Sequence, residues 1–175
     1  LMQSIVRGAT KEELLEVASF YDYLEIQPHT NNTFLVRKGL MPDEQALIDM
    51  NKTVIELGEA LNKPVCATCD VHYLTPEEKI YREIMLTACG YPDSDEQPDL
   101  HLRTTDEMLA SFPYLSEEKA YEVVVTNTRA INDSIEDIKP VPDGTYSPKI
   151  EGADKAFTEM CYRNAKAIYG DPLPR

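Results

Sequence analysis

Apolar and polar positions in the first half of the chain predict a β-α-β unit. Aromatic and β-branched residues over 20–27 predict a strand, which Pro28 ends. After Pro42, apolar residues recur every three or four positions, as on one face of a helix: Leu47, Met50, Val54, Leu57 and Leu61. A second short apolar run predicts a strand over 65–70. Strand, helix and strand in this order predict parallel strands joined by a right-handed crossover.

Capping signals mark the starts of four further helices. Each begins with Ser or Thr followed by acidic residues of a first turn, at Thr10, Thr75, Thr104 and Ser116. Residues 28–41 and 91–99 are expected to be irregular, because turn-forming residues interrupt them. Gly58, inside the long helix, is expected to cost that helix a little stability.

Residues 139–175 have a different pattern. Prolines recur through 139–148 and predict a stiff, partly extended linker. A final helix is expected to begin at Gly152 or Asp154 and to end at 170–172. Its apolar side chains are expected to face inward: Phe157, Met160, Cys161, Ala165 and Ile168. The termini indicate a piece excised from a longer protein.

Composition and charge narrow the functional class. The 175 residues form one domain or slightly more, and 42% of them are hydrophobic, enough to bury a core. Because 31 acidic residues face 17 basic ones, the net charge of −14 argues against a main contact to DNA or RNA. A divalent metal is a more natural partner for so acidic a chain. No apolar run is long enough to span a membrane.

The four cysteines do not form a disulfide framework. Their spacing in a chain of this length suits the cytosol. Cys66 and Cys69 form a C-x-x-C pair, but on a strand they would point to opposite faces and could not share one metal. A redox or zinc-knuckle function is therefore disfavoured, and Cys66 is expected beside a site rather than as a ligand.

Candidate metal ligands follow the second predicted strand. If that strand continues through 65–72, alternation puts Asp70 and His72 on one face with their ligand atoms close together. Parallel barrels build their sites at this carboxyl end of the strands. A capping aspartate beside a packed histidine is the alternative interpretation.

The remaining candidates are weaker. Glu25 lies on the first predicted strand, where an inward acid needs a partner; a structural salt bridge is favoured over a metal role. His29 is expected in a solvated loop, and His101 at an exposed position of an extended segment.

Several segments resemble the PHP (polymerase and histidinol phosphatase) domain, and more narrowly that of PolC-type bacterial DNA polymerase III. They are 63–82, which contains the Asp-x-His motif, 20–28, 98–109, 150–154 and 162–174, and the likeness extends over nearly the whole chain. The resemblance implies the part of the PHP domain after an inserted exonuclease. It also implies an α/β fold in which a partial parallel (β/α) PHP barrel precedes a helical extension and a connector helix.

The resemblance also implies a division of the chain. Residues 1–90 would be the C-terminal portion of the split barrel, 91–138 the helical extension, and 139–175 a linker and first helix toward the polymerase core. The early histidines of PHP domains have no match here, so only Asp70 and His72, with Glu25 as a weaker candidate, remain as metal ligands.

Three functions follow from these observations. The favoured one is a structural and metal-binding portion of a replicative DNA polymerase with 3′–5′ exonuclease, itself inactive when isolated. A stand-alone metal-dependent phosphoesterase and an acidic helical interaction module are the alternatives. Histidine and carboxylate favour zinc or manganese over magnesium, which would serve the parent polymerase. The implied partners are the rest of the polymerase chain and other replisome proteins, with DNA bound only through the parent and no membrane. The implied location is the cytoplasm.

Overall fold

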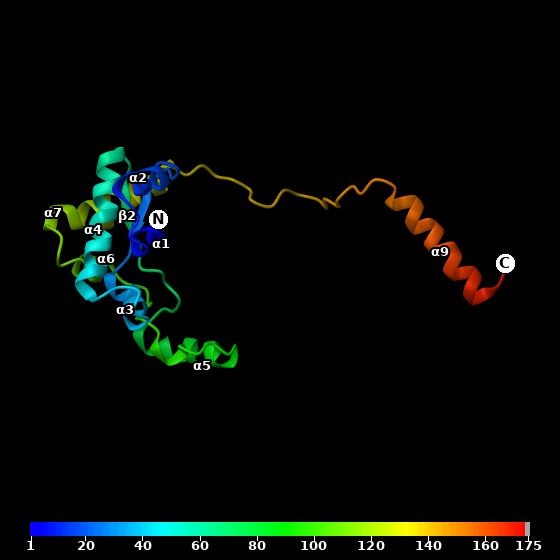
Figure 1. The fold of residues 1–175 in the computed structure, drawn as a ribbon, viewed down its shortest axis with the longest axis horizontal. Helices are drawn as coiled ribbons and strands as arrows, with labels where there is room; N and C mark the ends of the chain where they lie inside the picture. Colours follow the sequence, from blue (N-terminus) through cyan, green and yellow to red (C-terminus); the bar gives the residue numbers. More distant parts are fainter. Residues whose placement is uncertain (174–175) are drawn as a thin grey trace. The chain divides into compact units, whose positions relative to one another are not determined.

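A parallel pair of short strands and the long helix that joins them organise residues 1–136 (Figure 1). In this computed structural model, which describes residues 1–173, β1 (Leu24–Ile26) pairs with β2 (Val65–Ala67), and Glu25 lies opposite Cys66. The predicted β-α-β unit is confirmed, although each strand is shorter than its apolar run suggests. The described residues thus form a mixed, mainly helical fold around a small parallel sheet.

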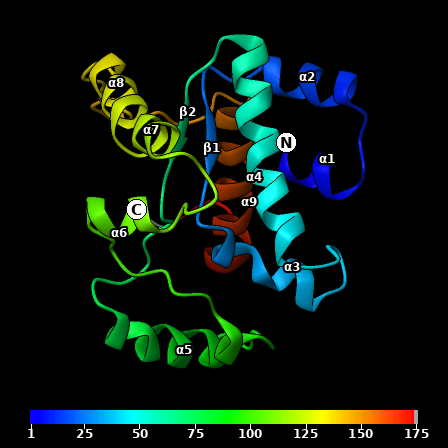
Figure 2. The same cartoon turned by 90° about the vertical axis from the view of Figure 1, so that its left-hand side faces the viewer.

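Helix α4 (Glu44–Leu61) connects the two strands. The Asp43 side chain caps it by accepting a hydrogen bond from the Ala46 N–H at 2.9 Å, and Asn62 ends it in the left-handed region at φ 53°. Figure 2 shows α4 running beside β1. The buried face contains the predicted apolar positions except Leu61, together with three further residues: Leu47, Met50, Asn51, Val54, Ile55, Leu57 and Gly58.

Gly58 has a packing role that the sequence did not reveal. A Cβ atom at this position would lie 3.1 Å from the Lys63 carbonyl oxygen and far inside contact distance of Val65 Cγ2. Glycine therefore allows β2 to approach the last turn of α4. The cost to helix propensity that Gly58 is expected to cause thus accompanies a packing role that favours glycine at this position.

The other helices surround this unit. They are α1 (Met2–Val6), α2 (Lys11–Ser19), α5 (Lys79–Ala88), α6 (Thr105–Ala110) and α7 (Glu117–Tyr121), which continues through the π-helix η4 (Glu122–Thr126) into α8 (Asn127–Ser134). The predicted capping boxes at Thr10, Thr75 and Thr104 are confirmed.

One hydrophobic core joins early and late parts of this unit. Met108, Phe112 and Val123 belong to the same buried cluster as Leu24 and Ile26 of β1. The helices of 105–134 are therefore packed on the sheet rather than on one another alone. Asn127 reinforces this contact, since its Nδ2 donates to the Val65 carbonyl oxygen at 2.9 Å along the outer edge of β2.

Residues 28–41 are more regular than expected. They contain the 3₁₀ helix η1 (His29–Asn32) and the helix α3 (Thr33–Arg37). Asn31 and Asn32 are each only 6% exposed, so they are buried polar residues and not surface turn markers. Two further 3₁₀ turns, η2 (Pro76–Glu78) and η3 (Ser94–Glu96), flank α5.

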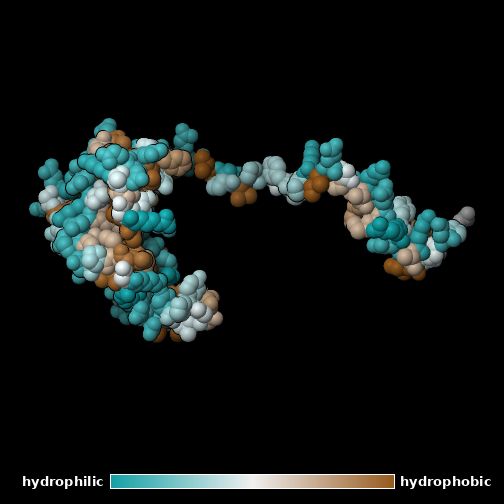
Figure 3. Space-filling model, viewed as in Figure 1, coloured by the Kyte–Doolittle hydropathy of each residue, from teal (hydrophilic) through white to brown (hydrophobic). Residues whose placement is uncertain are grey.

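Residues 137–175 form a second unit. No helix or strand occurs within 139–148, and α9 (Ala153–Tyr169) begins after Gly152. Within its own unit, α9 buries none of the apolar side chains that were expected to face inward, and Phe157 is 65% exposed. Apolar side chains are visible on this unit in Figure 3. Among the described residues, no helix is long and apolar enough to cross a membrane.

Candidate functional site

The segment after β2 forms a loop in place of the predicted strand extension. The Thr68 N–H still donates to the Ile26 carbonyl oxygen at 3.0 Å, but the ladder ends there. Asp70 then adopts φ 53°, in the left-handed region that aspartate tolerates better than most residues. The argument from strand alternation was therefore wrong, and a turn determines the relation between Asp70 and His72.

That turn nevertheless keeps Asp70 and His72 together. His72 Nδ1 lies 2.7 Å from the Asp70 carbonyl oxygen and 3.9 Å from its Oδ2 atom. The Asp70 side chain is 48% exposed and the His72 side chain is 33% exposed. A histidine that donates through Nδ1 to a backbone carbonyl presents Nε2 as a metal ligand, an arrangement common in metal sites.

The residues present are an incomplete metal site. Tight zinc sites use three or four protein ligands, whereas the loop offers one carboxylate and one imidazole. Within residues 1–173, no three His, Cys, Asp or Glu side chains gather closely enough to hold an ion. The donor types fit zinc or manganese, but their number does not support a metal-dependent reaction step by these residues alone.

Glu25 is the middle residue of β1, and its side chain reaches Thr68 at the start of the loop after β2. Its Oε1 atom accepts hydrogen bonds from Thr68 Oγ1 and, at 3.1 Å, from Gln27 Nε2. A salt bridge was expected for Glu25, but neutral hydrogen-bond donors pair with its carboxylate instead. Glu25 is exposed, which explains how its charge is tolerated without a cation.

Cys66 is poorly suited to metal or redox chemistry. It is buried, and burial together with the negative charge of Glu25 raises the pKa of the Cys66 thiol. The reactive, metal-binding form of cysteine is the thiolate, which this environment disfavours. All four cysteines are free thiols.

The other two histidines lie in less exposed positions than expected. His29 was expected in water, but its side chain is only 13% exposed and its Nε2 lies 2.6 Å from Glu44 Oε1. Its ring packs edge-on against Tyr114 at 5.8 Å. His101 is half-buried, and its backbone forms an isolated parallel β-bridge with that of Tyr73. Neither histidine is near enough to other ligands to extend the Asp70 and His72 pair into a group of three in the described structure.

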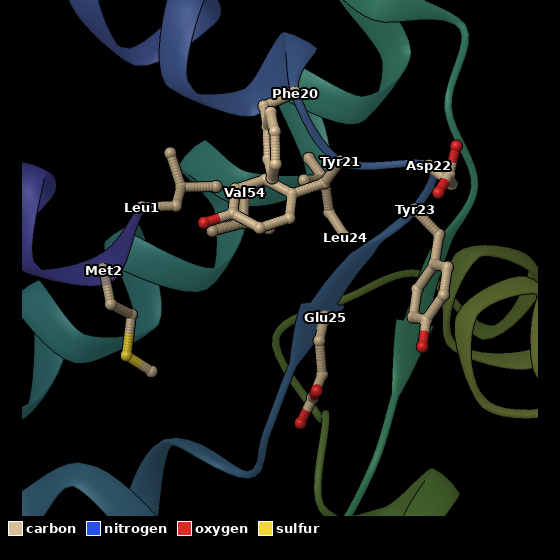
Figure 4. Close-up of a pocket in the computed structure, with 9 residues that line it drawn as sticks. All are labelled: Leu1, Met2, Phe20, Tyr21, Asp22, Tyr23, Leu24, Glu25 and Val54. Atoms are coloured by element: carbon tan, nitrogen blue, oxygen red, sulfur yellow. The ribbon is translucent and has the colours of Figure 1, made fainter. Parts of the chain in front are cut away.

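A groove of about 500 Å³ lies beside β1 (Figure 4). In Figure 4 the rings of Phe20 and Tyr21 lie near Leu1 and Val54, whereas the Glu25 carboxylate points away from them. Phe20 is 84% exposed. The groove is lined mainly by apolar and aromatic side chains: Leu1, Met2, Phe20, Tyr21, Asp22, Tyr23, Leu24, Glu25 and Val54.

Comparison with known proteins identifies relatives across almost the entire chain. The chain is 48% identical over 174 residues, 99% of its length, to "DNA polymerase III PolC-type" of Clostridium perfringens (strain 13 / Type A). It is 50% identical over 166 residues, 93% of its length, to the protein of the same name from Bacillus subtilis (strain 168). This chain is homologous to a segment of PolC-type DNA polymerase III. It spans 12% of the length of each relative, and no protein-family model matches it.

The PolC relationship confirms the resemblance at the level of the polymerase family. It assigns no role to individual residues, so the site remains defined by geometry. Sequence reasoning missed Asn31 and Arg82, which both line a polar cavity near Asp70. The only available signal was an Asn-Asn pair shortly after a strand, and such pairs usually mark turns.

Proposed function

We propose that this chain is the C-terminal portion of a PHP domain in a replicative, PolC-type DNA polymerase III. Identity of 48% across 99% of the chain to a PolC-type relative carries this proposal. The parallel β-α-β unit, with polar side chains after each strand, is compatible with part of a (β/α) barrel. Residues 1–90 would close the split barrel, 91–138 extend it, and 139–175 lead toward the polymerase core.

In this proposal the segment has a scaffold role. The parent polypeptide would synthesise DNA from a DNA template, use magnesium for that chemistry, and proofread through its 3′–5′ exonuclease. The segment would support the fold of that polypeptide and would not perform the polymerisation. Its net charge of −14 agrees with a position away from the DNA backbone.

Asp70 and His72 would contribute to a structural metal site in the same polypeptide. Zinc or manganese suits the imidazole and carboxylate pair better than magnesium does, and Glu25 is a weaker third candidate. Further ligands would come from other parts of the PolC-type chain, which is about eight times longer, since these residues span 12% of its relatives. When bound, the metal would supply a cationic cross-link between strand ends.

A melting experiment on the intact parent polypeptide tests the metal site. A metal held at about 100 times its Kd adds about 2.7 kcal/mol to the free energy of unfolding. We expect EDTA to lower the melting temperature of the wild-type protein and to leave that of the Asp70→Asn/His72→Ala variant unchanged. Asp133→Asn, an exposed change in α8, is the matched control and should behave as wild type. A wild-type melting temperature that does not respond to EDTA would show that the metal proposal is wrong.

The polymerase assignment has a separate test. The intact polypeptide that carries this chain should extend a primer, whereas the 175-residue chain alone should neither extend primers nor degrade single strands. Both reactions require clustered acids that hold two catalytic cations. Turnover by the isolated chain that survives removal of contaminating nucleases would contradict the scaffold role.

An interaction module is the second candidate, and α5 favours it. This helix has no buried residue, and Ile80, Ile84 and Met85 on it are each at least half exposed. Such a face is typical of a surface that another polypeptide covers. Stoichiometric zinc or manganese in the purified parent, measured by elemental analysis, would favour the metal-binding scaffold over a pure interaction module. The stand-alone phosphoesterase is disfavoured, since the described residues contain no group of three ligands.

A further inference from the structure

A polar cavity of about 330 Å³ lies within residues 31–100, beside the Asp70 loop. Asn31 forms part of its wall and is only 6% exposed. The Nδ2 atom of Asn31 donates to the Cys69 carbonyl oxygen at 3.2 Å, which fixes the orientation of the amide. Its Oδ1 atom is buried and accepts no hydrogen bond from residues 1–173. Because an unpaired buried polar atom costs about 1–3 kcal/mol, a ligand that donates a hydrogen bond to this acceptor would remove that cost.

Arg82 of α5 lines the same cavity and also has an unpaired atom. Its Nε–H is buried and finds no acceptor in the part of the chain that the structure describes. The two other cations of the lining are already paired, Arg37 with Glu96 at 3.0 Å and Lys38 with Asp93 at 3.6 Å. Arg82 is thus the cation most available to an anionic group.

The rest of the lining limits what the ligand can be. Phe34, Leu86, Tyr91 and Leu100 give the cavity apolar and aromatic walls. Its volume is at the lower end of the range of about 300–1,000 Å³ for small-molecule pockets, so only a compact ligand fits. The ligand needs an N–H donor for Asn31, a flat apolar surface for the walls, and one anionic group for Arg82.

We infer that this cavity binds a nucleoside monophosphate. The base contacts the apolar walls and donates an N–H to Asn31 Oδ1, while the phosphate accepts from the guanidinium of Arg82. Asp70 also lines the cavity, and its carboxylate repels the phosphate but can accept a hydrogen bond from the sugar hydroxyl. A single phosphate needs few cations, so the ligand is compatible with the acidic chain that disfavours a long nucleic acid. This site goes beyond the scaffold role and does not depend on a metal.

Binding of the four deoxynucleoside 5′-monophosphates to the 175-residue chain, measured by isothermal titration calorimetry, tests the inference. At least one should bind saturably, and at least tenfold more tightly than 2-deoxyribose 5-phosphate, because the sugar phosphate lacks the base. In ¹H–¹⁵N spectra, the Nε–H signal of Arg82, identified by its loss in Arg82→Met, should shift on titration. Arg82→Met should weaken binding about tenfold or more, as expected for a lost charge-assisted hydrogen bond.

Arg129→Met is the matched control, because Arg129 is an exposed arginine of α8 outside the cavity. Circular dichroism melting of both variants verifies that each is folded. The inference is overturned by the absence of saturable nucleotide binding to the folded wild-type chain. It is also overturned if sugar phosphate binds as tightly as nucleotide, or if Arg82→Met and Arg129→Met have the same affinity as wild type.

Discussion

Helices α4 and α9 have nearly the same length, 18 and 17 residues, and both repeat apolar residues at helical spacing. They differ in what covers those residues. Seven residues of α4 are buried in its own unit, whereas α9 has no buried residue within its unit. The comparison shows that an apolar repeat predicts the helix but does not identify its packing partner.

The physical reason lies in the neighbouring elements. β1, β2 and α2 cover the part of the apolar face of α4 that contains Val54 and Leu57. Leu47 and Met50 lie in a second buried cluster with Leu35 of α3. α9 follows a segment with no helix or strand, so its own unit offers no comparable surface. Because most helical stability in proteins comes from packing and not from propensity, α4 should be much harder to unfold than α9.

The largest expected difference is in thiol reactivity. Cys66 of β2 is buried and its thiol pKa is raised by burial, whereas Cys161 of α9 is exposed. Iodoacetamide reacts with the thiolate, so at neutral pH Cys161 should be alkylated at least about a hundredfold faster than Cys66. Mass spectrometry of peptides from a timed reaction measures both rates. Denaturant should remove the difference, and equal rates in the native protein would contradict the burial of β2.

Truncating one apolar residue in each helix gives the next largest contrast. Leu47 is fully buried, and Leu47→Ala should lower the free energy of unfolding by about 2–5 kcal/mol. Phe157→Ala, the control in α9, should change it by less than about 0.5 kcal/mol, because Phe157 is 65% exposed. Urea denaturation followed by circular dichroism measures both values. A large loss in the Phe157 variant would show that α9 has a partner in the isolated chain.

Gly58→Ala should change the free energy of unfolding by less than Leu47→Ala does. The direction of that change tests the close contact between α4 and β2. In an ordinary helix this change is stabilising by about 0.5–1 kcal/mol. Here the new methyl group would overlap Val65, so we expect the protein to lose about 1–3 kcal/mol. Glu56→Ala, at an exposed position of the same helix, controls for propensity. If Gly58→Ala stabilises the protein in the same denaturation assay, the close contact between α4 and β2 is not present.

Local signals predicted the elements that depend on nearby residues. The caps at Thr10, Thr104 and Ser116 have the expected hydrogen bonds, and the helix-crossover argument correctly predicted parallel strands. These features involve groups within a few residues, or a chirality rule common to all chains. The short lengths of β1 and β2 could not be predicted, because apolar runs continue beyond the last paired residue.

The site was harder to predict than the fold. Asp70 and His72 were correctly expected to lie near each other, but a left-handed turn brings them together, and its formation depends on the end of the strand pairing. The burial of His29 and Asn31 depends on Tyr114, Cys69 and other residues far along the chain. Such tertiary contacts cannot be derived from local spacing, which is why His29 was expected in a solvated loop and Asn31 in an irregular segment.

The hydrogen bond from Asn127 to Val65 has a consequence for self-association. It occupies a carbonyl group on the outer edge of β2, while β1 pairs only with β2 in the described residues. A sheet that can add a strand at two edges can grow into an open-ended fibre, whereas a sheet with one accessible edge can only pair with an identical edge. A strand added beside β2 would have to displace the Asn127 side chain from Val65, so the hydrogen bond disfavours strand addition at this edge.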